Sequence, residues 1–182
     1  VDKAMERFLC EAPPADVCEL LVLGLNHEQQ HQELLYTDIK YILGNNPLFP
    51  AYDKNYVSPK MPHQESAFID MSEGIYEIGF AGDGFCFDNE LSRHKVYLNA
   101  FAISSNLVTN TEYLEFINAG GYHDFRYWHS EGWAWANEHK IEAPMYWHLI
   151  DGEWQGYTYH GLQPLSLKDP VCHISYYEAY AY

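Results

Sequence analysis

The 182 residues of this chain suffice for one large domain or two small ones, and an apolar fraction of 47% can fill a hydrophobic core. The 10 Lys and Arg residues against 26 Asp and Glu residues give a net charge of −16, which repels a phosphate backbone and excludes nucleic acid as an expected partner. The sequence has neither a run of ~18 apolar residues nor a signal peptide, so we expect no membrane association and a cytoplasmic location.

The first predicted elements are helices. Residues 2–10 have apolar residues at helical spacing, and the prolines at positions 13–14 break this helix. Asp16 and Glu19 are spaced as an N-cap and its N3 partner. We therefore expect a second helix that begins at Asp16 and ends at Gly44, in the sequence GNNP.

The pattern changes after this helix. Residues 46–67 contain four prolines and are predicted to be a linker. The segments 74–80 and 94–104 have the apolar pattern of strands, and Asp151-Gly152 is typical of a type I′ hairpin turn between two aromatic-rich runs. Strands and helices together predict an α+β fold for residues 68–182, behind a helical part in residues 1–45.

Two further helices are marked by capping boxes. Thr109 with Glu112 begins one, which Gly120-Gly121 end, and Ser175 with Glu178 begins another. The second of these starts about one turn before the last residue, and the chain opens without an initiator Met. We expect from this that the chain is an internal fragment of a longer protein.

The four cysteines show no metal-binding or disulfide pattern. They lie at positions 10, 18, 86 and 172, without a CxxC pair. This spacing argues against a zinc ribbon and against a dense disulfide framework, so reduced thiols that pack as small apolar groups are expected.

Two histidines four residues apart form the candidate metal site. With His27 taken as 0° on a helix, His31 lies at about 40° and Asp38 at about 20°, within the apolar face that includes Leu20, Leu23 and Leu34. We expect this face to be buried. Side chains at this spacing can reach one metal ion, Gln30 borders the same face, and Gly24 leaves space one turn earlier.

Other interpretations of this pair remain open. The residues 27–31 spell H-E-x-x-H, the zinc-protease motif in which Glu28 would be the general base. The metzincin continuation, with its glycine and third histidine, does not follow. Two histidines that hydrogen-bond within a helical core are the structural alternative.

Several stretches resemble, in order, one family of enzymes. The stretch GLNHEQQHQELLYTDIKYI is similar to the iron-binding helix of the sulfoxide synthases of ergothioneine biosynthesis. The stretches FCFDNELSRHKVYLNAFAIS, VTNTEYLEFINAGGY, GWAWANEHKIEAPMYW and DPVCHISYYEAYAY resemble the domain that these enzymes share with the formylglycine-generating enzyme. The resemblance implies the end of a DinB-like metal-binding bundle in residues 1–45, a linker in 46–67 and the start of a C-type-lectin-like domain in 68–182.

The resemblance also implies an activity. Family members are non-haem Fe(II) oxidoreductases that use O₂ to join a cysteine-type thiol to hercynine, so His27 and His31 would be iron ligands and Gln30 would bind hercynine. The third histidine ligand, the arginines that bind the thiol substrate and the catalytic tyrosine have no counterpart in this chain. No catalytic residue is therefore expected here, and this chain alone should bind iron weakly and turn over little or nothing.

Four points stay open at this stage. The thiol is either γ-glutamylcysteine or cysteine, and the oligomeric state is not specified by any pattern. The 16 tyrosines and 5 tryptophans either form cation–π contacts with a trimethylammonium substrate or bury area in a loop-rich domain. A zinc-dependent hydrolase and a non-catalytic lectin-like binding protein remain the alternatives to the oxygenase.

Overall fold

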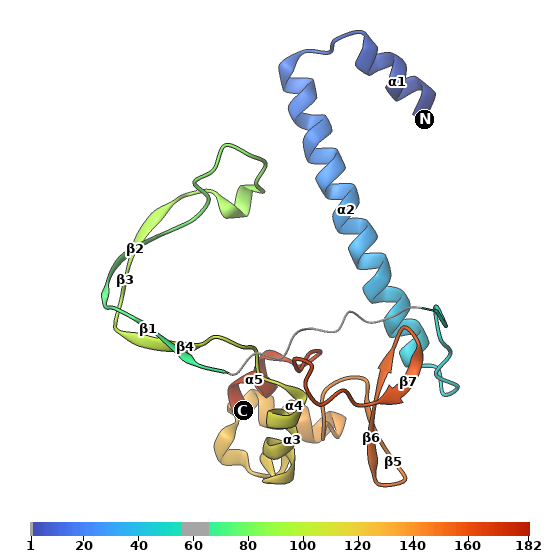
Figure 1. Cartoon of the computed structure of the whole chain (residues 1–182), viewed down its shortest axis with the longest axis vertical. Coiled ribbons are helices and arrows are strands. Elements are labelled where there is room, and N and C mark those ends of the chain that lie inside the picture. Colours follow the sequence, from blue (N-terminus) through green and yellow to red (C-terminus); the bar gives the residue numbers. More distant parts are fainter. Residues whose placement is uncertain (1, 56–65) are drawn as a thin grey trace. The chain divides into compact units, whose positions relative to one another are not determined.

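The computed structural model describes residues 2–55 and 66–182 and contains helices and strands in both halves of the chain (Figure 1). It therefore confirms the mixed α+β class. The chain forms two compact units, one of Val1–Ile39 with Met71–Phe101 and the other of Lys40–Asp70 with Ala102–Tyr182. Half of the predicted linker, residues 56–65, lies outside the described residues.

The first unit begins with helices α1 (Asp2–Cys10) and α2 (Ala15–Gly44), as predicted. The predicted N-cap was wrong by two residues, because α2 starts at Ala15 and Asp16 lies in its first turn. The amide groups of Val17 and Cys18 donate to the carbonyl oxygen of Pro14 at 3.1 and 3.0 Å. Proline is suited to a helix start because it lacks the N–H that would be unpaired there, and Asp16 instead places its carboxylate in the positive first turn.

The apolar face of α2 is exposed. Leu20, Leu23 and Leu34 keep 65%, 43% and 55% of their surface accessible, and Gly44 is the single buried residue among the described residues of the helix. The prediction that this face is buried was therefore wrong for this chain. A helix buries such a face only when another element covers it. The expectation that residues 1–45 are the end of a DinB-like bundle stays a prediction.

The rest of this unit is a two-stranded antiparallel ribbon. Strands β2 (Gly74–Ile78) and β3 (His94–Leu98) pair with Gly74 opposite Leu98, and η1 (Asp88–Glu90) lies in the loop between them. Strand β3 ends at Leu98, so the predicted strand region 94–104 is divided into β3 and β4 (Phe101–Ser104). The sequence did not indicate the partner of β4, which is β1 (Phe68–Met71).

The second unit combines short helices with a three-stranded meander. The strands β5 (Trp147–Ile150), β6 (Glu153–Thr158) and β7 (Gly161–Pro164) are antiparallel neighbours. Asp151 and Gly152 have φ values of 51° and 82°, which confirms the predicted type I′ turn. The helical elements are α3 (Asn110–Asn118), η2 (Gly121–His123), η3 (Phe125–Tyr127), α4 (Ser130–His139) and α5 (Tyr176–Ala181).

Both predicted capping boxes are present. Thr109 Oγ1 accepts from the Glu112 amide at 3.3 Å, and Glu112 Oε2 accepts from the Thr109 amide at 2.7 Å. The same pair of bonds joins Ser175 and Glu178 at the start of α5. The hydrogen bonds from Thr109 lower the pKa of the Glu112 carboxyl, so the start of α3 is held by an ionised cap.

Removing the first of these caps should lower stability. The Thr109→Ala variant loses the acceptor for the Glu112 amide, and we expect the free energy of unfolding to fall by about 1 kcal/mol. Thr109→Ser keeps the oxygen and is the control, which should stay close to the parent chain. Urea unfolding followed by circular dichroism checks both, and equal loss in the two variants would mean that the cap does not act through this hydrogen bond.

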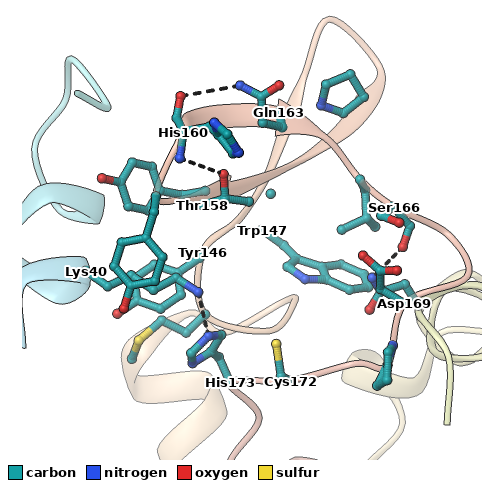
Figure 2. A pocket seen from close by; sticks show the side chains of 18 residues that line it. Lys40, Tyr146, Trp147, Thr158, His160, Gln163, Ser166, Asp169, Cys172 and His173 are labelled. Carbon is teal, nitrogen blue, oxygen red and sulfur yellow. Dashed lines mark hydrogen bonds between the residues drawn. The ribbon is translucent and has the colours of Figure 1, made fainter. Parts of the chain in front are cut away.

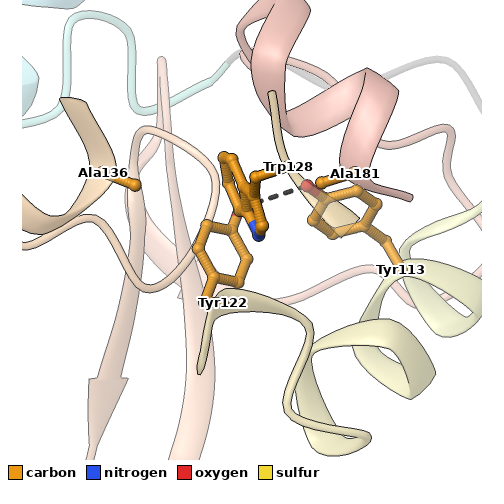
Figure 3. Close-up of a cluster of buried hydrophobic side chains, with 5 residues drawn as sticks. All are labelled: Tyr113, Tyr122, Trp128, Ala136 and Ala181. Atoms are coloured by element: carbon orange, nitrogen blue, oxygen red, sulfur yellow. Dashed lines mark hydrogen bonds between the residues drawn. The ribbon is translucent and has the colours of Figure 1, made fainter. Parts of the chain in front are cut away.

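The core of the second unit is aromatic and contains a buried hydrogen-bond chain. Tyr113, Tyr122 and Trp128 are its large buried side chains, shown with Ala136 and Ala181 in Figure 3. The Tyr113 and Tyr122 hydroxyls lie 3.1 Å apart, and the Tyr122 hydroxyl donates to Glu178 Oε1 at 2.6 Å. These residues support the interpretation that large aromatics in this part serve to bury area.

This core predicts a loss of stability at alkaline pH. Burial first, and then the hydrogen bonds to Glu178 and Tyr113, raise the pKa of Tyr122. An unfolded tyrosine ionises near pH 10, so the stabilisation is complete below about pH 10 and is lost as the pH rises further, by up to about 1.4 kcal/mol per pH unit for one group. Urea unfolding between pH 8 and 11 should show this fall, and Tyr122→Phe should make the dependence shallower. An unchanged slope in Tyr122→Phe would contradict the assignment.

Candidate metal centre

The two predicted metal ligands lie side by side on α2. The ring centroids of His27 and His31 are 4.5 Å apart with an interplanar angle of 82°, and both side chains are exposed. This is the i, i+4 arrangement that lets two imidazoles approach a single ion. Neither ring is turned away from the other, so the expected pairing is present although the expected burial is not.

The neighbouring residues fit the helical positions that the sequence predicts. Gln30, Glu28 and Asp38 are exposed on α2. A Cβ added at Gly24 would meet no atom within 4 Å among the described parts of the chain, so the space predicted one turn before the pair is open. Glu28 lies about 100° from His27 and about 60° from His31 around the helix axis, so it borders the side that the two histidines share at one edge, as Gln30 does at the other.

The pair brings two imidazole groups together and does not by itself make a complete ligand set. Within residues 2–55 and 66–182, no three His, Cys, Asp or Glu side chains lie close enough to hold one ion. Imidazole nitrogen suits Fe(II), Cu(II), Ni(II) and Zn(II), so the donor type agrees with a first-row transition metal without selecting one.

A second candidate site, in the second unit, was not predicted. It is a pocket of about 490 Å³ whose lining includes Lys40, Trp147, Asp169, Cys172 and His173 (Figure 2). The residues come from the end of α2, from the meander and from the segment before α5. Because they are far apart in sequence, no local spacing could have indicated the pocket.

Lys40 has an unusual environment in this pocket. Its Nζ lies 2.7 Å from His173 Nε2, and it lies 4.9 Å from the ring centroid of Tyr146 and 5.8 Å from that of Tyr159. Burial lowers the pKa of the ammonium group. Burial, and then the charge of Lys40, likewise lower the pKa of His173, so that His173 is a neutral acceptor for the lysine.

The backbone at one wall of the pocket is strained. Tyr146 and His173 have φ values of 73° and 61°, a left-handed conformation that is uncommon for residues other than glycine. The Met145 amide donates to the His173 carbonyl oxygen at 3.1 Å, which ties the two segments together. The end of α2 packs closely here, since a Cβ on Gly44 would lie 2.8 Å from Tyr146 Cε1. Strain of this kind is concentrated at functional sites in proteins.

Comparison with known proteins adds a family relation. Residues 54–182 match the model of the FGE-sulfatase family, described as a sulfatase-modifying factor enzyme 1-like domain.

No described helix is both long and apolar enough to cross a bilayer.

The chain is also similar to three curated proteins. A hercynine oxygenase from Mycolicibacterium thermoresistibile is 30% identical over 163 residues, covering 87% of this chain and 34% of the relative. Hercynine oxygenases from Mycobacterium tuberculosis and Mycolicibacterium smegmatis are 31% and 30% identical over 163 residues, covering 90% and 88% of this chain and 38% and 36% of the relatives. The chain thus spans about a third of the length of the curated relatives it matches.

Proposed function

Because the chain belongs to the FGE-sulfatase family of sulfatase-modifying factor enzyme 1-like domains, we propose that it forms part of an Fe(II)- and O₂-dependent sulfoxide synthase. The proposed reaction joins hercynine and a cysteine-type thiol through a new C–S bond. One O₂ supplies the sulfoxide oxygen, and its other oxygen leaves as water with the hydrogens of the C–H and S–H bonds. The relatives named hercynine oxygenase support this choice of substrate and oxidant.

The extent of the similarity supports a role for the histidine pair. The match covers 87% of the 182 residues and leaves about 24 residues unmatched. A continuous matched region therefore begins no later than about residue 25, and it includes positions 27 to 31. The family model itself starts only at residue 54. The likeness to the oxygenases therefore extends beyond that domain into the part of α2 that carries His27 and His31.

We assign iron binding to His27 and His31 on the basis of their geometry. The two rings, 4.5 Å apart between centroids on one side of α2, offer nitrogen donors to a single ion. Bound Fe(II) would supply the activation of O₂. The contribution of these two residues is to hold the ion on a rigid helix and to leave part of its coordination sphere to other ligands.

Gln30 is proposed to bind hercynine. Its exposed side chain precedes His31 and borders the face of the pair, at about −60° from His27. A primary amide offers two N–H donors and one acceptor oxygen, which can orient a polar substrate beside an ion. Glu28, at the opposite edge of the same face, has no part in this proposal, and no residue of this chain is assigned a catalytic role.

The test is product formation by the protein that contains this chain. After anaerobic loading with Fe(II), hercynine and O₂ are supplied with either γ-glutamylcysteine or cysteine, and the product is identified by mass spectrometry. The proposal predicts a sulfoxide with one of the two thiols, which also identifies the thiol substrate. Stoichiometric zinc with peptidase activity that is lost in Glu28→Ala would replace this proposal by the hydrolase.

A further inference from the structure

The ammonium group of Lys40 is only partly hydrogen-bonded in a pocket that the proposed function does not use. An ammonium carries three N–H donors, and the contact with His173 Nε2 at 2.7 Å occupies one. The other two N–H groups have no hydrogen-bond partner among residues 2–55 and 66–182. The Tyr146 and Tyr159 rings flank the charge without accepting these hydrogens in a conventional bond. A half-buried cation with unused donors calls for an anionic acceptor.

An acidic group lies across the pocket. Figure 2 shows Lys40 and Asp169 on opposite sides, with the indole of Trp147 between them in this view. Cys172 lies within reach of both charges: burial raises the pKa of its thiol most, the charge of Lys40 lowers it and that of Asp169 raises it. The pocket therefore has a positive end and a negative end.

The walls between these ends are largely apolar. Trp147, Tyr157, Leu165 and Met145 line the pocket, and its volume of about 490 Å³ is within the range of small-molecule sites. An occupant therefore needs an apolar body as well as one anionic group. A phosphate dianion fits poorly, because a single ammonium faces it, Asp169 repels it and the whole chain carries a charge of −16.

We propose that this pocket binds a small organic monocarboxylate, with the carboxylate on Lys40 and the apolar body against Trp147. The site lies entirely in the second unit and is separate from His27 and His31, which belong to the first. Asp169 favours ligands whose far end carries a hydrogen-bond donor. The pocket thus selects by charge at one end and by shape along the indole.

Benzoate and benzamide provide a matched pair of probes, because they share a ring and differ in charge. Binding to the whole chain is measured by calorimetry and by the shift of the Trp147 indole N–H signal in NMR spectra. We expect benzoate to bind about tenfold more tightly than benzamide, as for a hydrogen bond to a charged group. Lys40→Met should abolish this preference, Lys40→Arg should keep most of it, and Lys54→Met, an exposed lysine in the same unit, should leave it unchanged.

The cysteines provide an independent measurement of where the probe binds. Saturating benzoate should slow alkylation of Cys172 severalfold, whereas exposed Cys10 and Cys18 on the first two helices should react at the same rate with and without the probe. Equal affinity for the two probes, a preference that survives in a folded Lys40→Met variant, or no protection of Cys172 would each overturn the proposal. All of these results are independent of iron and of hercynine, so they do not depend on the proposed function.

Discussion

Replacing His31 by alanine should lower hercynine-dependent O₂ consumption by at least about 100-fold in the protein that contains this chain, since even residues that only orient metal ligands change affinity or activity by 10–100-fold. His31 and His27 lie on one side of α2 with ring centroids 4.5 Å apart. Removing one imidazole leaves the other to hold the ion alone on this helix. An oxygen electrode with Fe(II), hercynine and thiol present measures the effect.

Glu28→Ala is the matched control for this variant. Glu28 is exposed on the same helix turn, and in the proposed oxygenase it binds neither the metal nor a substrate, so its loss should leave the rate within about twofold of the parent. The oxygenase account predicts a large effect at His31 and a small one at Glu28. A large loss of activity in Glu28→Ala, with His31→Ala nearly unaffected, would contradict it.

Truncation of Tyr113 should have the largest effect on stability. The side chain is completely buried and stacks on Tyr182 with ring centroids 5.5 Å apart, while its hydroxyl contacts that of Tyr122 at 3.1 Å. Tyr113→Ala removes an aromatic ring from the core, and such changes cost about 3–5 kcal/mol of unfolding free energy. Urea unfolding followed by tryptophan fluorescence measures the loss.

Tyr176→Ala is the corresponding surface control. Tyr176 keeps 70% of its surface exposed in α5, so its removal should change stability by no more than about 0.5 kcal/mol. If the two tyrosine variants were equally stable, the aromatic cluster around Tyr113 would not be the core of the second unit.

The sequence predicted those helices and turns that are marked by a capping box or a turn motif. The capping boxes at Thr109 and Ser175 and the Asp151-Gly152 turn were confirmed. Helix α4 was missed because its N-cap, His129, makes no side-chain cap bond and its C-cap, Lys140, takes the left-handed conformation normally left to glycine. Four-residue strands such as β1 and β7 are too short for an alternating pattern to be distinctive.

The two candidate sites also differ in how much of each could be predicted from the sequence. The spacing of His27 and His31 could be predicted because a single helix sets it, and the family relation that the motifs suggested is confirmed by the match to residues 54–182. The sequence could not predict whether the helix face that carries these histidines is buried, because burial depends on which other element packs against it. The pocket at Lys40 depends on the meander and the chain near His173, which only the fold brings together.

Iron K-edge X-ray absorption on the Fe(II)-loaded protein that contains this chain tests directly whether the iron is bound by His27 and His31. If His27 and His31 bind the same ion, the parent spectrum contains imidazole scattering that decreases in each single alanine variant and decreases further in the double variant. Glu28→Ala should reproduce the parent spectrum. Imidazole scattering of full strength in the double variant would contradict the assignment of iron to this helix.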